Sequence, residues 1–171
     1  MKKLCIAILI VLIATAAMAE SAGGFRDIPW GSSLAELSAK GLEKIPVPKG
    51  VTSPTESFRR KSDELKIGEA AVEGISYNFL NGRLYSVTID FSGYDNMLRV
   101  MAYCEKHFGK NTGSMVKEME RFVSFGSPAT GALLYYQFAR HAFFVRYGRL
   151  FVYSRDMDRT PQALWKRGQD E

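Results

Sequence analysis

The chain has 171 residues, of which 46% are hydrophobic and 24% are charged, and its formal net charge at pH 7 is +5. This positive excess is modest and argues against a nucleic-acid binder. A chain of this length buries enough surface to form one core without disulfides or a metal ion, so we expect a single domain.

Residues 1–19 have the pattern of a secretory signal peptide. Two lysines at positions 2 and 3 precede an apolar run over residues 4–16, and a small-x-small cleavage site ends at Ala19. Cleavage between Ala19 and Glu20 would leave 152 residues, 20–171, with a net charge of +3. The apolar run is short for a membrane anchor, which must cross about 30 Å of hydrocarbon. We therefore expect an exported protein, periplasmic or extracellular, whose mature chain has no transmembrane segment. A lipoprotein is not favoured, because Cys5 lies at the start of the run and not at its end.

The mature chain opens with FRDIPWGSSLAEL, residues 25–37. Ser33 and Glu36 are spaced as a capping box, which predicts a short helix over about 33–40 that Gly41 ends. The prolines between residues 46 and 54 then predict an extended surface loop. Trp30 beside this region has two interpretations: a core plug that closes one end of a sheet, or an exposed platform for a ligand.

Residues 56–67 predict two short strands joined by a turn at Ser62-Asp63. Basic and acidic residues alternate closely here, so we interpret this segment as a solvated edge of mixed charge, with Asp63 and Glu64 in contact with water.

A β-hairpin is predicted over residues 74–93, GISYNFLNGRLYSVTIDFSG. A two-residue Asn81-Gly82 loop would place Tyr77 opposite Ser86 and send the two apolar sets to opposite faces. We therefore expect a three-residue loop, 80–82, that pairs Tyr77 with Tyr85 and keeps the large residues on one face.

A helix is predicted next, over about residues 94–107. Met97, Met101, Cys104 and Phe108 recur at helical spacing, so we expect Cys104 to be a small buried core residue. A redox thiol is the alternative, but the mature chain offers no CxxC partner for it.

The sequence pattern predicts that the second half of the chain repeats the first. Gly-Arg-Leu-Tyr at 82–85 returns as Gly-Arg-Leu-Phe at 148–151, which predicts a second hairpin with its loop at 146–148. Strands are also predicted over 115–125 and 133–138, and a last short helix over about 160–167. Together these elements predict one α+β domain, an antiparallel sheet with helices packed on one face, built from two tandem α-β-β-β(β) repeats at about 25–93 and 94–155.

The opening FRDIPWGSSLAEL, the hairpin YNFLNGRLYSV and the helix end YCEKHFGK resemble a group of uncharacterised exported bacterial proteins that share an F-R-x-I-x-W-G start. The short helix that begins on W-G-S-S before antiparallel strands is also loosely similar to the small BamE-like and BLIP-like folds, which serve in envelope assembly or protein inhibition. The lipidated cysteine of BamE-like proteins is missing here. The resemblance therefore implies an architecture and a compartment, and no functional residue is carried over.

The sequence shows no catalytic motif: HExxH, CxxC, GxSxG and a glycine-rich phosphate loop are all absent, and its two histidines, His107 and His141, stand apart. We expect no cofactor and no metal. The unusual stretch is 121–155, which holds five arginines, ten aromatic residues and no acidic residue. It predicts either a cationic, aromatic sheet surface for an anionic envelope component or an acidic protein, or core aromatics with arginines on a solvated face. The candidate binding residues are Trp30, Arg140, Arg146, Tyr147, Arg149 and Arg155.

The function that these observations favour is a non-enzymatic, soluble periplasmic binding or adaptor protein that contacts another component of the cell envelope. The alternative is a small-ligand carrier or enzyme with a site formed between the two repeats. A deep pocket joining His141 or Cys104 to carboxylates would favour the alternative, and an open sheet would favour the first.

Overall fold

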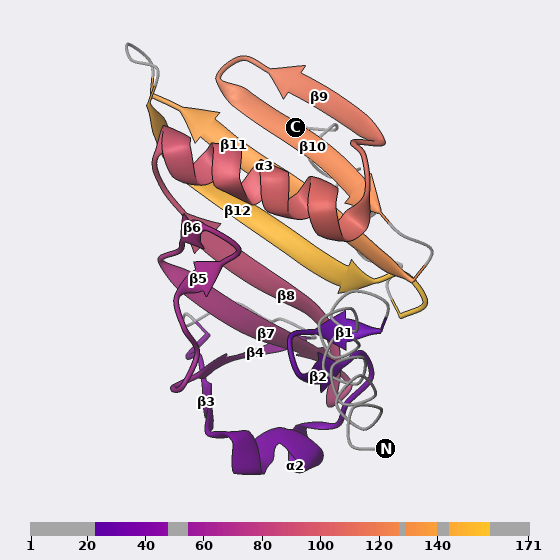
Figure 1. Cartoon of the computed structure of the whole chain (residues 1–171). Coiled ribbons are helices and arrows are strands. Elements are labelled where there is room, and N and C mark those ends of the chain that lie inside the picture. Colours follow the sequence, from indigo (N-terminus) through magenta and orange to yellow (C-terminus); the bar gives the residue numbers. More distant parts are fainter. Residues whose placement is uncertain (1–22, 48–54, 127–128, 140–143, 158–171) are drawn as a thin grey trace, which may run out of the picture.

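The computed structural model describes residues 23–47, 55–126, 129–139 and 144–157 (Figure 1). The signal peptide predicted at 1–19, the helix predicted at 160–167, the candidate residue Arg140 and most of the proline-rich loop lie outside the described residues.

The elements follow one another in the order β1 (Gly24–Phe25), β2 (Ile28–Pro29), α2 (Leu34–Leu37), a 3₁₀ turn (Ser38–Lys40), β3 (Leu42–Lys44), β4 (Thr55–Arg60), β5 (Lys66–Ile67), β6 (Ala70–Ala71), β7 (Gly74–Leu80), β8 (Arg83–Phe91), α3 (Tyr94–Phe108), β9 (Gly113–Lys117), β10 (Glu120–Gly126), β11 (Thr130–Phe138) and β12 (Val145–Ser154).

The fold is α+β and is dominated by one large antiparallel sheet. Its eight strands lie in the order β3-β4-β7-β8-β12-β11-β10-β9, so the two central strands, β8 and β12, come from distant parts of the sequence. Helix α3 packs against β10, β11 and β12 (Figure 1). The small β1-β2 and β5-β6 pairs add buried residues such as Ile28 and Ile67 to the same core.

The predicted short helix is present and has the predicted ends. The Ser33 hydroxyl accepts from the Glu36 backbone N–H, and the Glu36 carboxylate accepts from the Ser33 N–H, which completes the capping box. Gly41 adopts a left-handed conformation with φ of 70°, which ends the 3₁₀ turn that follows α2.

The hairpin β7-β8 is present, but its predicted loop is wrong. Leu80 pairs with Arg83, so the loop is the two-residue Asn81-Gly82, with φ of 51° and 73°. Phe79 then pairs with Leu84 and Asn78 with Ser86, which leaves Tyr85 as the extra residue of a β-bulge. This bulge places Tyr77 opposite Val87, both fully buried. A two-residue loop alone would send the apolar residues of the two strands to opposite faces. The bulge at Tyr85 corrects this within β8, so the turn does not need a third residue.

The second predicted hairpin is wrong, because residues 145–154 form one continuous strand, β12. Gly148 lies within it and pairs with Phe91 of β8. A Cβ at position 148 would lie 2.1 Å from the Phe91 ring, so glycine is required here for close approach and not for a turn. Conversely, the strand predicted over 115–125 is a hairpin, β9-β10, with a two-residue turn at Glu118-Met119.

The segment predicted as a solvated edge contains a buried carboxylate. The side chain of Asp63 is 3% exposed and lies 2.8 Å from Arg26 Nη1 and 3.1 Å from Arg60 Nε. Its Oδ2 also accepts from the Tyr77 hydroxyl at 2.7 Å, and burial followed by this hydrogen bond raises the pKa of Tyr77. We call Asp63, Arg26, Arg60 and Tyr77 the Asp63 cluster. The two strands predicted here do not pair with each other, because β5 pairs with β6.

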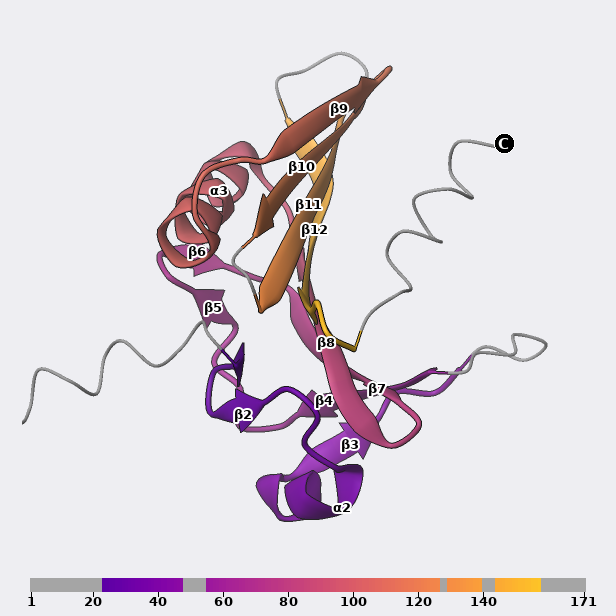
Figure 2. The ribbon, with the colours of Figure 1, turned by 90° about the vertical axis from the view of Figure 1, so that its right-hand side faces the viewer.

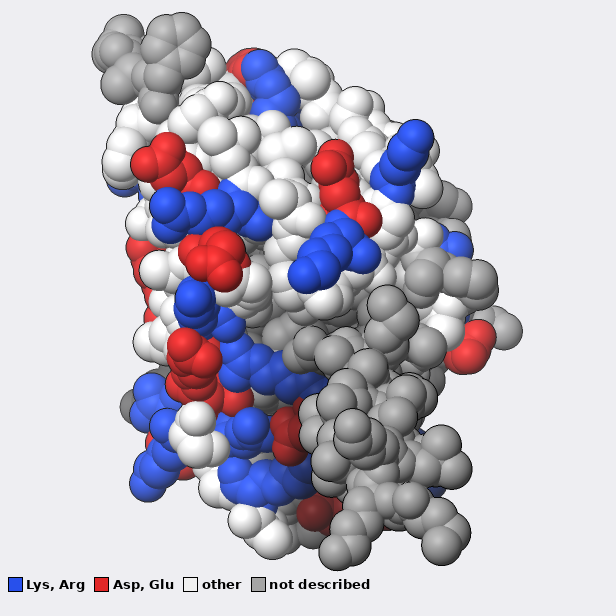
Figure 3. Space-filling model, viewed as in Figure 1, with Lys and Arg blue, Asp and Glu red and all other residues white. Residues whose placement is uncertain are grey.

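Asp27 extends these charges toward the surface. It accepts from Lys40 Nζ and from Arg60 Nη1, each at 2.8 Å, and these two cations, Lys40 first, lower its pKa to about 2. Figure 3 shows acidic and basic side chains interleaved on the face that it presents. The predicted mixture of charges is therefore correct for this region. The predicted contact with water is wrong for Asp63, whose side chain is buried.

Helix α3 is confirmed at Tyr94–Phe108, and its buried residues are Met97, Val100, Cys104 and Phe108. Cys104 is 0% exposed, and burial raises the pKa of its thiol. It is a core residue, as predicted.

Candidate binding surface on the open sheet face

The sheet has two different faces, which the alternation along β12 separates. Gly148, Leu150 and Val152 are buried, and they alternate with Tyr147, Arg149, Phe151 and Tyr153, which are half-buried. Figure 2 shows α3 on one side of β9–β12 and none of the described helices or strands on the other. We call the side that carries Tyr147, Arg149 and Phe151 the open face.

Arg149 lies at the centre of the open face, directly opposite Asp90 of β8. Its Nε and Nη2 donate to the two Asp90 oxygens at 2.6 and 3.1 Å, a bidentate pair, and the Tyr147 hydroxyl donates to Asp90 Oδ1 at 2.8 Å. The guanidinium carbon also lies 5.4 Å from the Tyr147 ring centre and 5.8 Å from that of Phe151. The Asp90 carboxylate therefore holds the Arg149 guanidinium next to the rings of Tyr147 and Phe151.

The same contacts set the protonation of these groups. Burial lowers the pKa of Arg149, but the hydrogen bonds and charge of Asp90 outweigh burial, and the net shift is upward. Burial and then the hydrogen bond to Asp90 raise the pKa of Tyr147. At neutral pH Arg149 is therefore charged and Tyr147 is neutral, and the Arg149 charge is paired with the Asp90 side chain.

Aromatic side chains continue across the open face from β12 to β10. Tyr135 of β11 lies opposite Arg149, with its ring centre 6.2 Å from that of Tyr147 and 5.0 Å from that of Phe122. Its hydroxyl donates to Glu120 at 3.0 Å, and burial followed by Glu120 raises the pKa of Tyr135 to about 12. We call Phe122, Tyr135, Tyr147 and Phe151 the aromatic row.

On the other half of the open face the side chains are small and polar. Asn78 of β7 is the hub: its Oδ1 accepts from the Ser57 hydroxyl at 2.8 Å, and its Nδ2 donates to Ser86 at 3.1 Å and to Thr88 at 2.9 Å. This network spans β4, β7 and β8. The open face is therefore aromatic over β10–β12, with Arg149 paired to Asp90, and carries hydroxyl and amide groups over β4–β8.

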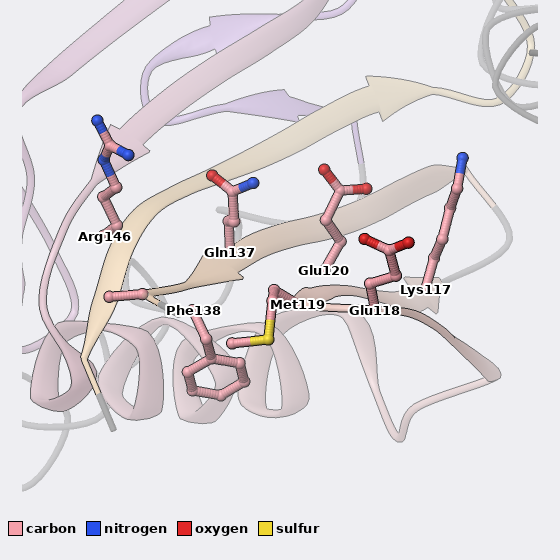
Figure 4. A pocket seen from close by; sticks show the side chains of 8 residues that line it. Lys117, Glu118, Met119, Glu120, Gln137, Phe138 and Arg146 are labelled. Atoms are coloured by element: carbon pink, nitrogen blue, oxygen red, sulfur yellow. The ribbon is translucent and has the colours of Figure 1, made fainter. Parts of the chain in front are cut away.

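A hollow lies at one end of the open face, where β9 and β11 end and β10 and β12 begin. Its volume is about 430 Å³, and Figure 4 shows Arg146, Gln137, Glu120, Glu118 and Lys117 directed to the same side, while Phe138 and Met119 point toward α3. Arg146 is the extra residue where the β11-β12 register shifts, because Gln137 pairs with Tyr147 and Phe138 with Val145. The hollow thus places a cation at each end and carboxylates between them.

The structure brings some of the predicted binding residues together and separates others. Tyr147 and Arg149 share Asp90, and Arg146 is exposed beside them at the hollow. Arg155 is exposed beyond the end of β12. Trp30 is half-buried against the core, and its Nε1 donates to the Thr130 hydroxyl at 3.1 Å, which is the geometry expected of the core plug.

Sequence reasoning missed Asp90 and Asn78, the two residues that organise the open face. Both lie on the polar side of the β7-β8 hairpin, and the sequence alone did not indicate that β8 pairs with β12. The one available signal was that Asp90 is the single acidic residue of the strand RLYSVTIDF.

Within the described ranges, no group of three or more histidine, cysteine, aspartate and glutamate residues is placed to hold a metal ion. No helix in those ranges is long and apolar enough to cross a membrane. Comparison with protein-family models, with curated proteins and with solved structures gave no match for this chain.

Proposed function

We propose that this chain is a non-enzymatic, exported binding or adaptor protein that uses the open face of its sheet to hold another protein of the cell envelope. The observation that carries the proposal is the aromatic row with Arg149 fixed at its centre by Asp90. Tyrosine and arginine are enriched among the residues that dominate binding energy in protein interfaces. Side chains already held in place lose little conformational entropy on binding.

The charge of the open face favours a protein partner over an anionic lipid or glycan. Arg149 is neutralised by Asp90, and Glu120 lies at the end of the aromatic row as the acceptor of the Tyr135 hydroxyl. Arg149 therefore adds no net positive charge to the open face. The Arg121 side chain donates to the backbone carbonyls of Glu118 and Glu120.

The proposal includes export to the periplasm with removal of residues 1–19 between Ala19 and Glu20, as the sequence pattern indicates. It also includes an origin from two tandem units. In chain order, α2 precedes four strands of the large sheet, β3, β4, β7 and β8, and α3 precedes the other four, β9 to β12. In the sheet, the second set lies beside the first in reverse order, so that β8 is next to β12. This mirrored order supports a duplicated body whose two last strands meet at the centre of the open face.

The experiment is a cross-linking capture from intact cells that express the exported chain. The variant Tyr147→Ala/Phe151→Ala removes two rings of the aromatic row, and Tyr94→Ala/Leu98→Ala removes two side chains, 42% and 45% exposed, from helix α3 as a matched control. We expect the first variant to lose at least tenfold of the captured partner, because interface aromatics at a centre each contribute about 2 kcal/mol or more.

The control variant should capture the partner as the wild type does, and both variants should retain a cooperative thermal transition. Equal capture by the wild type and by the Tyr147→Ala/Phe151→Ala variant would contradict the proposal. Loss of capture by the helix variant alone would move the interface to α3.

The hollow supports a second candidate function, a carrier of a small zwitterionic ligand such as an amino acid or short peptide. Its volume of about 430 Å³ lies in the usual range for ligand pockets, and Lys117 and Arg146 stand on either side of Glu118 and Glu120. Thermal unfolding with free amino acids and dipeptides tests this candidate. A ligand that stabilises the wild type but not Arg146→Ala would support it, and no stabilisation by any of these compounds would count against it.

A further inference from the structure

The two edges of the eight-stranded sheet are protected very differently. The edge strand β3 has only three residues, and Glu43 and Lys44 within it form ion pairs with side chains of β4 and its following turn. Pro46 follows directly after this strand and Ile45. Short length, charge and a nearby proline all discourage a further strand from pairing there.

The opposite edge, β9, is longer, has no proline and carries one charged residue, Lys117. Its five residues are GSMVK, and among the described strands β9 pairs with β10 alone. Gly113, Ser114, Val116 and Lys117 are exposed, and Val116 is 63% exposed. Figure 2 shows β9 as the outermost strand, with no described element beyond it. An exposed, regular edge of this kind is a template for another strand.

The register of the β9-β10 hairpin shows which backbone groups are directed outward. Lys117 pairs with Glu120 across the two-residue turn, and Met115 pairs with Phe122. In a two-residue hairpin the pair beside the turn exchanges hydrogen bonds, and hydrogen-bonded pairs alternate along the ladder. Met115 and Lys117 therefore bond to β10, and the N–H and C=O groups of Ser114 and Val116 point away from the sheet.

We propose that β9 pairs antiparallel with β9 of a second copy of this chain, about a two-fold axis at Met115. Ser114 then exchanges hydrogen bonds with Val116 of the partner subunit, and Val116 with the partner subunit's Ser114, so that all outward groups of these two residues are used. Lys117 faces the partner's Gly113, and no like charges are opposed. A second copy fits because an antiparallel strand pairs with itself by symmetry, and the same surface serves both subunits.

This pairing goes beyond the proposed binding function, because it adds a self-contact at a different surface. It joins the two eight-stranded sheets edge to edge, so the open faces of both subunits form one continuous surface. A contact made by one strand is small, so the dimer should form at high protein concentration and dissociate on dilution.

Sedimentation equilibrium over a range of concentrations tests the contact. The wild type should shift from monomer to dimer as its concentration rises, and Val116→Pro should stay a monomer, because proline removes an outward N–H and leaves the bonds to β10 in place. The control is Val47→Pro, which changes another exposed valine that lies between two prolines, after the opposite edge strand β3 and not in β9. It should dimerise as the wild type does.

A disulfide tests the register and does not depend on the folding of the proline variant. Opposed residues in a non-hydrogen-bonded pair have Cα atoms about 4.5 Å apart, within the range of about 4.4–6.8 Å that a disulfide allows. Met115→Cys should therefore form covalent dimers under mild oxidation, and Val47→Cys should not. A wild type that stays monomeric at every concentration, a Val116→Pro variant that dimerises normally, or a Met115→Cys variant that links no better than Val47→Cys would overturn the proposal.

Discussion

The Asp63 cluster allows the sharpest test of what stabilises the N-terminal half. Asp63→Ala would leave Arg26 and Arg60, whose side chains are 18% and 16% exposed, without their shared carboxylate, and the buried Tyr77 hydroxyl without its acceptor. Removal of one partner of a buried ion pair costs about 3–5 kcal/mol. Because both guanidinium groups keep some contact with water, we expect the lower end of this range, about 3 kcal/mol. For a domain of this size, that loss lowers Tm by about 6–12 °C.

The assay is thermal and urea unfolding followed by circular dichroism, with three comparison variants. Glu64→Ala changes an exposed neighbouring carboxylate and should leave Tm unchanged. Tyr77→Phe removes one hydrogen bond and should cost about 1 kcal/mol. Asp63→Asn keeps an acceptor for Tyr77 but no charge for the arginines, and should resemble Asp63→Ala. The reasoning fails if Asp63→Ala is no less stable than Glu64→Ala.

Three further predictions use the same unfolding assays. The pKa of Asp27 is lowered from 3.8 to about 2, so its contribution to stability is present above about pH 4 and is lost as pH falls toward 2. The Tm of the wild type should therefore fall more steeply than the Tm of Asp27→Asn between about pH 4 and about pH 2. Parallel curves of Tm against pH would refute this. Gly148→Ala forces a Cβ against the Phe91 ring and should destabilise the fold by about 1–3 kcal/mol. Gly74→Ala is the control and should cost less, because no atom lies near the Cβ it adds. Equal Tm values for the two variants would show that Phe91 moves aside freely. The buried Cys104 thiol, whose pKa burial raises, should react with a thiol reagent only after unfolding, and rapid reaction of the native protein would disprove its burial.

Local structure was predictable where the signal lay in neighbouring residues. The capping box at Ser33 and Glu36 correctly predicted the start of α2. The spacing of four, three and four residues along Met97, Met101, Cys104 and Phe108 correctly predicted α3 and its buried side. Both depend on interactions within a few turns of one helix. The antiparallel α+β class followed from the same local patterns.

Register and glycine roles were not predictable, because they depend on strands that are far apart in sequence. The bulge at Tyr85 and the straight course of β12 through Gly148 each satisfy packing against another strand, and a local turn signal looks the same in either case. Asp63 was misread for a similar reason: its partners Arg26 and Tyr77 lie 37 and 14 residues away.

The candidate site was predictable only in part. Tyr147 and Arg149 were identified from the excess of arginine and aromatic residues, but that composition suggested a cationic surface. Asp90, 59 residues before Arg149, neutralises it, and no local pattern indicates this pairing. The chemistry of the open face thus became clear only when β8 and β12 were placed side by side.

The central position of β12 also constrains how the protein is assembled. Because the chain is synthesised from its N-terminus, β8 is complete long before residues 145–154 are available. The last of the described strands, β12, must then enter the middle of the sheet. Until it does, the molecule consists of two incomplete halves, each with an unsatisfied strand edge that attracts other chains. The unfinished chain is therefore most open to wrong strand pairing in the interval before β12 arrives, and a chain cut before residue 145 would be left with both of those edges open.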